Sequence, residues 1–204
     1  MSTYSYRTIK SPSEGLYKEK GSRFLSFAYP VYTDGEIRLH LDRLRREYFD
    51  ARHHCYAWVL GPDKKQFKAA DDGEPNHTAG DPILGQIRSN DLTHILIVVV
   101  RYFGGIKLGV GGLIQAYREA AADAIRKAVI VEEEVVVHAT LTYPFDKTSD
   151  IMRMIKDFNV LLLEQSYDTQ CVLTVQVPLR NQPAFISRIT QLNIHEPSIE
   201  YREH

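Results

Sequence analysis

The sequence predicts an α+β protein built from two domains. The last third of the chain shows the element order β-α-β-β-α-β, which is the signature of a ferredoxin-like unit. Three consecutive glutamates at residues 132–134 mark a boundary before it. The preceding residues combine apolar strand patterns with amphipathic helices. We therefore expect one domain over residues 15–131 and a ferredoxin-like domain over residues 134–204.

The first half of the N-terminal domain shows a strand, a helix and two further strands. A strand is predicted over residues 23–31, which are mostly apolar. Thr33 and Glu36 form a capping-box pattern, so a helix is expected to begin there. Turn residues separate two more strands, at residues 55–60 and 66–70.

The second half of this domain contains a short helix, a buried strand and a long helix. Asp81 suits the N-cap and Pro82 the first position of the short helix. The unbroken apolar run at residues 94–100 predicts a strand covered on both faces. Alanines at helical spacing after residue 112 predict a helix packed closely on the sheet. The segment at residues 1–22 is polar, and we expect it to be frayed where it begins.

The C-terminal domain contains no cluster of chemically active side chains, so we interpret it as a binding or scaffold domain. Its expected strands span residues 135–143, 160–167, 171–177 and 194–201, and its expected helices span residues 146–158 and 182–192.

Composition excludes several classes of protein. The net charge of −1 does not indicate a strongly basic nucleic-acid binder, although it permits a local basic patch. The two cysteines, Cys55 and Cys171, form no CxxC pair, so we expect free thiols and neither a disulfide framework nor a zinc site. No apolar run has the length of a signal peptide or a membrane span. We expect a cytoplasmic protein without cofactor or metal.

A glycine-rich segment is the least ordinary part of the sequence. Residues 104–112 hold five of the twelve glycines, follow the apolar run and lead into the long helix. Free N–H groups at a helix N-terminus form a natural anion site, and Arg101 and Lys107 could face the same anion. The segment matches neither the Walker A nor the GxGxxG pattern. The alternative is a tight turn that allows close packing.

An acidic loop is the second candidate. Asp71, Asp72 and Glu74 offer three carboxylates that suit a hard metal ion or acid–base chemistry. The same string is also ordinary turn chemistry, and Thr78 could serve only to organise the next helix. Cys55 beside histidines invites a nucleophile hypothesis, with a buried cysteine and a hydrogen-bonded histidine as the alternative.

Together these segments resemble the IMPACT/YigZ family over nearly the whole chain. The matching segments are EKGSRF at residues 19–24, ARHHCYA at 51–57, DDGEP at 71–75, TAGDPIL at 78–84 and VVRYFGGIKLGVGGL at 99–113. One departure is Asn76-His77, where the family usually has Ser-Gly or Ala-Gly. That departure puts in doubt any role that needs a bare backbone at position 77.

The resemblance implies a fold and a cellular setting. The family's N-terminal domain is similar to the β-α domain shared by a small-subunit ribosomal protein, elongation factor G domain IV and the GHMP kinases. Its C-terminal domain resembles the ferredoxin-like domain V of elongation factor G. Eukaryotic relatives regulate translation through an amino-acid starvation kinase pathway. Fold alone does not carry function, so the site must be argued from its residues.

Three functions remain open. The first is a non-enzymatic binding protein linked to translation, which recognises RNA or a ribosome-associated partner without DNA sequence specificity. The second is an enzyme acting on a phosphorylated or nucleotide small molecule, with the acidic loop opposite the glycine-rich loop and His53 as a base. The third is a protein–protein module. A pocket that joins both loops and holds a metal ion would favour the second function, and an open basic face with no pocket would favour the first.

Two sets of residues follow from these hypotheses. The predicted phosphate or nucleic-acid contacts are Arg101, Tyr102, Phe103, Gly104, Gly105, Lys107, Gly109, Gly111, Gly112 and Arg118. The predicted site loop consists of His53, Asp71, Asp72, Glu74 and Thr78.

Overall fold

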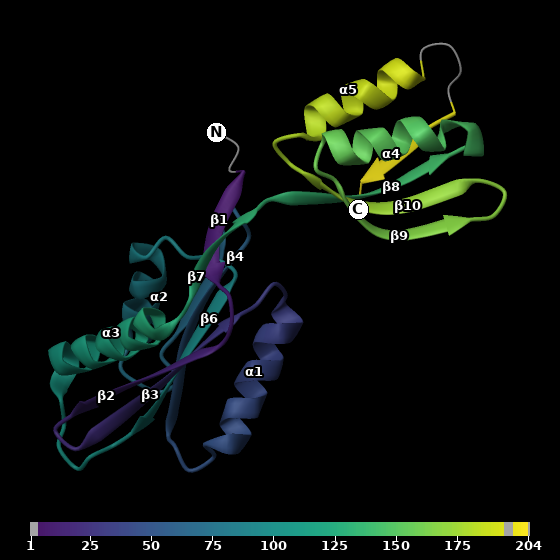
Figure 1. Cartoon of the computed structure of the whole chain (residues 1–204). Coiled ribbons are helices and arrows are strands. Elements are labelled where there is room, and N and C mark those ends of the chain that lie inside the picture. The colour runs from purple at the N-terminus through teal and green to yellow at the C-terminus, as the bar shows by residue number, and fades with distance from the viewer. Residues whose placement is uncertain (1–3, 194–197, 204) are drawn as a thin grey trace. The chain divides into compact units, whose positions relative to one another are not determined.

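The computed structural model describes residues 4–193 and 198–203 (Figure 1). The chain divides into two compact units, of which one is Tyr6–Glu133 and the other runs from Glu134 onward and includes the first residues of the chain. Both units combine antiparallel strands with helices. None of the described helices is both long enough and apolar enough to cross a bilayer.

An antiparallel sheet of five strands organises the N-terminal unit, in the order β2-β3-β6-β4-β5. Its strands are β2 (Ser13–Glu19), β3 (Ser22–Pro30), β4 (His53–Leu60), β5 (Gln66–Ala70) and β6 (Ile95–Tyr102). The central strand, β6, has every residue from Ile95 to Val100 fully buried. The expected strand with two covered faces is therefore confirmed.

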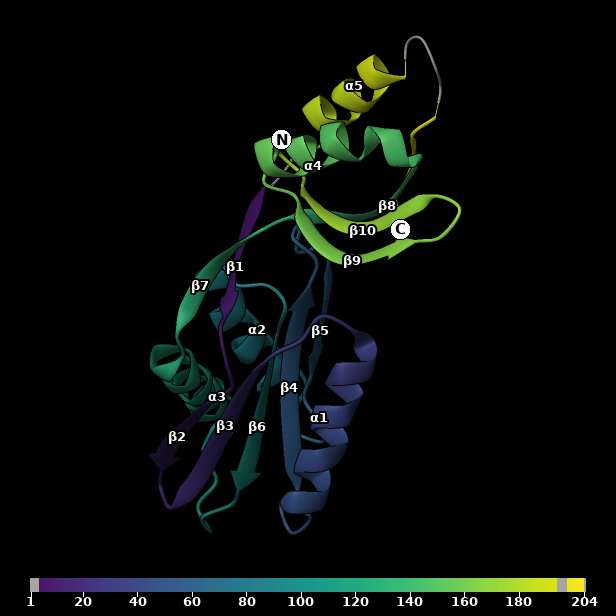
Figure 2. The same cartoon turned by 45° about the vertical axis from the view of Figure 1, so that its right-hand side comes forward.

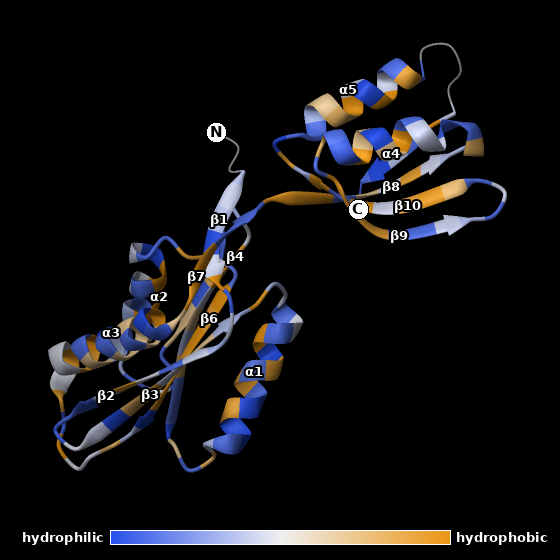
Figure 3. Ribbon diagram, in the orientation of Figure 1, coloured by the Kyte–Doolittle hydropathy of each residue, from blue (hydrophilic) through white to orange (hydrophobic). Residues whose placement is uncertain are grey.

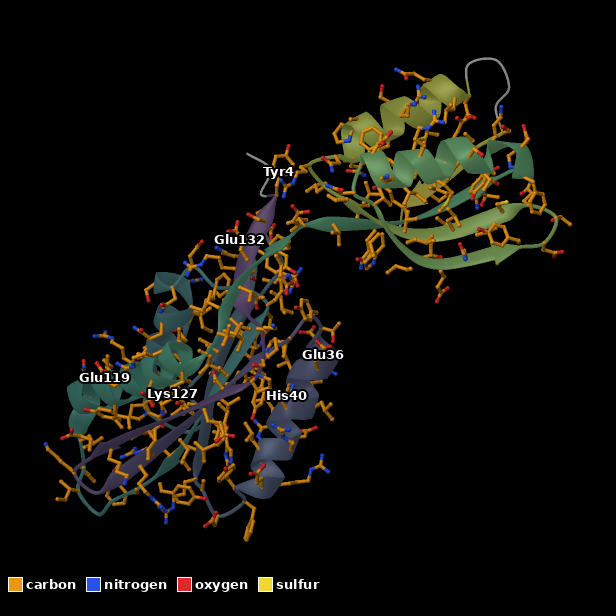
Figure 4. The ribbon with its side chains drawn as sticks, in the orientation of Figure 1. Tyr4, Glu36, His40, Glu119, Lys127 and Glu132 are labelled. Carbon is orange, nitrogen blue, oxygen red and sulfur yellow. The ribbon has the colours of Figure 1, made fainter. Side chains whose placement is uncertain are left out.

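Helices cover both faces of this sheet, as Figure 2 shows. One face carries α1 (Asp34–Glu47), which buries Ile37, Leu41 and Leu44 against the sheet. The opposite face carries α2 (Gly80–Ser89) and α3 (Gly109–Lys127). The predicted capping box at the start of α1 is confirmed, with bonds between Thr33 and Glu36 in both directions. Figure 4 shows Glu36 at that end of the helix.

Three expectations from the sequence differ from the structure. The polar N-terminal segment, expected to be frayed, forms β1 (Ser5–Ile9) and β2, because β1 pairs with β7 (Ile130–Glu134) and β2 pairs with β3. The short helix α2 has Ala79 rather than Asp81 at its N-cap. The long helix α3 already begins at Gly109, so part of the glycine-rich segment is helical.

The C-terminal unit confirms the predicted β-α-β-β-α-β order. Its antiparallel sheet has the strand order β11-β8-β10-β9, and its helices pack on one face around a core that includes Leu141, Leu173 and Phe185. Figure 3 shows apolar residues along β8 and β10. Residues 194–197 of the expected last strand lie outside the described residues. The elements are β8 (Val136–Tyr143), η1 (Phe145–Lys147), α4 (Thr148–Asp157), β9 (Leu161–Tyr167), β10 (Cys171–Pro178), α5 (Gln182–Leu192) and β11 (Glu200–Glu203).

Candidate functional site

Strand directions bring the acidic loop and the glycine-rich loop to the same end of the N-terminal sheet. His53 at the start of β4 lies opposite Arg101 near the end of β6, and β5 ends at Ala70 beside β4. The two loops that follow β5 and β6 therefore leave the sheet beside the start of β4. The sequence alone could not show whether these loops meet.

The two loops share a pocket of about 490 Å³. Its polar wall contains three cationic side chains, one carboxylate and one imidazole, from Arg52, Arg101, Lys107, Glu74 and His53. Its apolar wall contains Pro75, Phe103, Leu108, Val110 and Leu113. Phe103 was predicted as a contact residue, whereas Arg52 and the other apolar residues of the wall are absent from the predicted site residues. The missed residues lie within the matching segments at residues 51–57, 71–75 and 99–113, and only that position could have indicated them.

A buried ion pair joins the two loops. Arg101 Nη1 donates to Glu74 Oε1 at 2.6 Å, and the two side chains are only 8% and 4% exposed. Tyr117 donates its hydroxyl proton to the same Oε1 at 2.8 Å. The Arg101 guanidinium also lies 5.4 Å from the Phe24 ring centroid and 5.6 Å from that of Phe103. Because Glu74 compensates its charge, Arg101 is not the free cation that the sequence suggests.

Cys55 lies beneath this ion pair. Its sulfur is 2.9 Å from the Asp71 carbonyl oxygen and 3.3 Å from the Tyr117 hydroxyl. Burial raises the pKa of the Cys55 thiol and that of the Tyr117 phenol. The thiol therefore stays protonated, as expected for a buried structural cysteine rather than a nucleophile.

The remaining acidic residues organise the loop. Asp71 accepts backbone hydrogen bonds from His77, Ala79 and Gly80 at 2.8, 3.0 and 2.8 Å. Burial acts to raise the pKa of Asp71, but these bonds outweigh it and lower the pKa. Asp71 thus supplies the cap that Ala79 cannot give to α2.

Asp72 and Thr78 have similar local roles. Asp72 Oδ2 accepts from the His54 backbone N–H at 2.7 Å, and the Thr78 hydroxyl donates to the Pro75 carbonyl at 2.7 Å. Neither residue lines the pocket. Within the described residues there is no group of three or more His, Cys, Asp or Glu side chains suited to hold a metal ion.

His53 contributes a base to the pocket. Its Nδ1 lies 2.9 Å from the Asp72 carbonyl oxygen, which can only accept a hydrogen bond. The neutral ring must therefore carry its proton on Nδ1 to make this bond, which leaves Nε2 as the acceptor. His53 can accept a proton or a hydrogen bond from a ligand in the pocket through that atom.

His77 occupies the position where the resembling family usually has glycine. Its φ of +64° lies in the left-handed region, which a β-carbon disfavours. Its side chain is exposed and pairs with Asp81, Nδ1 to Oδ2, at 2.7 Å. The backbone at position 77 thus takes a glycine-like conformation, although the residue is histidine.

Replacing His77 with glycine is expected to increase the free energy of unfolding by about 1 kcal/mol, because it removes left-handed strain. The lost pair with Asp81 is exposed and contributes little. Urea denaturation of the wild type, His77→Gly and His77→Ala checks this. Alanine keeps the strain and should give no gain, so equal stability of the two variants would contradict the explanation.

The positions of the glycine-rich segment differ in whether, and why, they require glycine. A β-carbon at Gly104 would lie 1.9 Å from the Gly21 carbonyl carbon, so no side chain fits there. Gly105 and Gly109 have positive φ values of +89° and +72°. A β-carbon at Gly111, in contrast, would meet nothing within 4 Å. Packing within the described protein therefore does not require glycine at position 111.

The N-terminus of α3 is open. Its N-cap residue, Leu108, makes no side-chain hydrogen bond to the helix, and the first turn contains no acidic residue. The first N–H groups of this 19-residue helix lack a capping side chain, and the helix dipole gives them partial positive charge. Lys107 and Gly109 at this terminus line the pocket. An anion in the pocket would therefore meet both backbone donors and a cation.

Six predicted contact residues do not line this pocket, namely Tyr102, Gly104, Gly105, Gly111, Gly112 and Arg118. Tyr102 donates to Asp50 Oδ1 at 2.7 Å, and this bond, with burial, raises the pKa of Tyr102 to about 12. Arg118 lines a separate hollow of about 430 Å³ between α2 and α3, together with Ile114 and His77. The structure therefore separates Arg118 from Lys107.

Known proteins resemble this chain in sequence and in fold. Residues 20–125 match the family model described as the Impact N-terminal domain. The chain is 31% identical to the IMPACT family member YvyE of Bacillus subtilis, over 98% of this chain and 94% of that protein. It is 33% identical to the IMPACT family member YigZ of Escherichia coli, over 85% of this chain and 86% of that protein.

A solved structure described as that of a hypothetical protein has the same fold. The TM-score is 0.74 at 29% sequence identity, and the alignment covers 98% of this chain and 97% of that chain. The predicted α+β fold with two domains is thereby confirmed. On the strength of its sequence relatives and of the matching family model, the chain belongs to the IMPACT family.

Proposed function

We propose that this protein binds a nucleotide unit in the pocket between the acidic and glycine-rich loops, and that the nucleotide belongs to RNA in a role linked to translation. One observation carries the proposal. A single pocket of about 490 Å³ combines the uncapped N-terminus of α3, the cation Lys107 and the exposed aromatic ring of Phe103.

The phosphate would bind at the start of α3. Backbone N–H groups at a helix N-terminus donate to phosphate oxygens, and the helix dipole favours the negative charge. Lys107 adds a cation, and the open space at Gly111 permits a close approach to the backbone. Three cationic side chains against one carboxylate leave the pocket positively charged.

The base would bind along the apolar wall. The Phe103 side chain is exposed, at 55%, although it lies at the pocket. Stacking of a base on an aromatic ring contributes about 1–3 kcal/mol without selecting the sequence. Leu108, Val110 and Leu113 extend this wall. A pocket of this size accommodates one nucleotide rather than a duplex.

We propose that the bound nucleotide belongs to RNA because eukaryotic relatives in the IMPACT family are linked to translation. The net charge of −1 argues against strong non-specific attraction to a polyanion. We therefore expect modest affinity that falls as salt increases. A free nucleotide carries the same phosphate and base, so the test must include both sources.

Binding of a labelled single-stranded RNA and of nucleoside monophosphates is measured across a salt series for three proteins. Lys107→Glu is expected to weaken binding by at least about tenfold, since it replaces a charged contact with a repulsion. Arg118→Glu makes the same charge change in the separate hollow and is expected to stay within about twofold of the wild type.

Each outcome has a definite meaning. Tight binding of RNA with weak binding of monophosphates supports RNA as the source, and the reverse supports a free nucleotide. Absence of binding by the wild type at low salt would overturn the proposal. Equal losses in both variants would show that binding depends on overall charge rather than on this pocket.

A further inference from the structure

We propose that the Glu74–Arg101 pair reads the pairing edge of the bound base, so that the ligand must be an unpaired nucleotide. This inference rests on the proposed function. The observation behind it is the ion pair in the wall of the pocket. This pair uses only one oxygen of Glu74 and one terminal nitrogen of Arg101.

The unused atoms form a complementary pair. Both described bonds to Glu74, from Arg101 and from Tyr117, end on Oε1. Glu74 Oε2 and Arg101 Nη2 have no hydrogen-bond partner within the described part of the chain. Both belong to side chains that line the pocket. Two neighbouring side chains of the pocket wall therefore carry one unused acceptor and one unused N–H donor.

The pair is held in place. Its two side chains are almost fully buried, and Arg101 Nε is a buried atom without a hydrogen-bond partner. The guanidinium also lies close to the rings of Phe24 and Phe103. Charged groups fixed by packing and hydrogen bonds discriminate among ligands better than mobile surface side chains. A ligand that cannot hydrogen-bond to the unused atoms of such a pair is strongly disfavoured, because it leaves these buried polar atoms unpaired.

The pairing edge of a nucleobase has the matching chemistry. Each base carries on that edge an N–H donor beside an oxygen or nitrogen acceptor. The donor would bind Glu74 Oε2, and the acceptor would bind Arg101 Nη2. A base held in this way lies beside the Phe103 ring, because that ring also contacts the guanidinium. The same edge cannot then pair with a complementary strand.

The test uses modified ligands with the wild-type protein, so no variant has to fold. The tightest-binding of the four nucleoside monophosphates is compared with two methylated forms. One form is methylated at the ring nitrogen of the pairing edge, and the other at a ring carbon away from that edge. The first is expected to bind at least about tenfold more weakly, and the second within about twofold.

A second comparison uses one RNA sequence as a single strand and as a duplex, and we expect binding of the single strand alone. Equal affinity for the two methylated forms, or for strand and duplex, would overturn this inference and leave the proposed function standing. If no monophosphate and no RNA binds at low salt, the proposed function itself fails. The two failures are thus distinguishable.

Discussion

Replacing Gly104 with alanine is expected to destabilise the N-terminal unit by about 3 kcal/mol or more. The added β-carbon would lie 1.9 Å from the Gly21 carbonyl carbon and 2.1 Å from the Ser22 nitrogen. These are backbone atoms, so no rotamer change relieves the clash, and overpacking of this kind costs about 1–3 kcal/mol even where side chains can adjust. Urea denaturation of the wild type and the variant measures the effect.

Gly111→Ala is the matched control for this prediction. It lies in the same segment, but its new β-carbon meets nothing within 4 Å. Alanine also favours the helix over glycine by up to about 1 kcal/mol, so this variant should be as stable as the wild type or slightly more stable. Similar losses in both variants would show that the segment needs glycine for a reason other than close approach at Gly104.

Replacing Arg101 with methionine is expected to destabilise the protein by about 3–5 kcal/mol, because it leaves the buried carboxylate of Glu74 without its partner. The Glu74 side chain is 4% exposed and the ion pair has a distance of 2.6 Å, so water cannot readily replace the guanidinium. The free energy of unfolding at neutral pH measures the loss.

A double-mutant cycle separates the ion pair from packing. Glu74→Gln combined with Arg101→Met removes the isolated charge, so the double variant should be more stable than Arg101→Met alone. Purely additive losses would contradict the assigned coupling. A binding test should therefore change Lys107 rather than Arg101. An Arg101 variant is expected to lose stability whether or not Arg101 contacts a ligand.

Local patterns predicted the elements that local interactions determine. The capping box needs only Thr33 and Glu36, and it is present as predicted. The central strand was evident from consecutive apolar residues, because a strand covered on both faces has no polar alternation. The ferredoxin-like order in the C-terminal unit was likewise predicted from successive short patterns.

Partners distant in the sequence could not be predicted. Glu74 and Arg101 are separated by 27 positions and meet only because β4 pairs with both β5 and β6. The cap of α2 comes from Asp71, eight and nine positions before the N–H groups that it binds, whereas capping rules consider only adjacent residues. β2 was missed because its burial pattern is mostly exposed or intermediate, so its pairing with β3 was not apparent in its composition.

The candidate site was predicted in part. The glycine-rich loop and Glu74 were identified as candidate site residues, and the structure places both at one pocket. Lys107 and Arg118 were both predicted to contact phosphate or nucleic acid, whereas they line different hollows. They are eleven positions apart along the chain, and Arg118 lies on α3, which begins at Gly109, in a hollow that α2 also lines.

The most direct test of the proposed function is an amide proton–nitrogen correlation spectrum of isotope-labelled protein, recorded while a nucleoside monophosphate is added at low salt. We expect the largest shifts at the amides of Gly109, Val110 and Gly111, with smaller shifts at Phe103 and Lys107. An unchanged spectrum, or shifts confined to residues away from the start of α3, would contradict it.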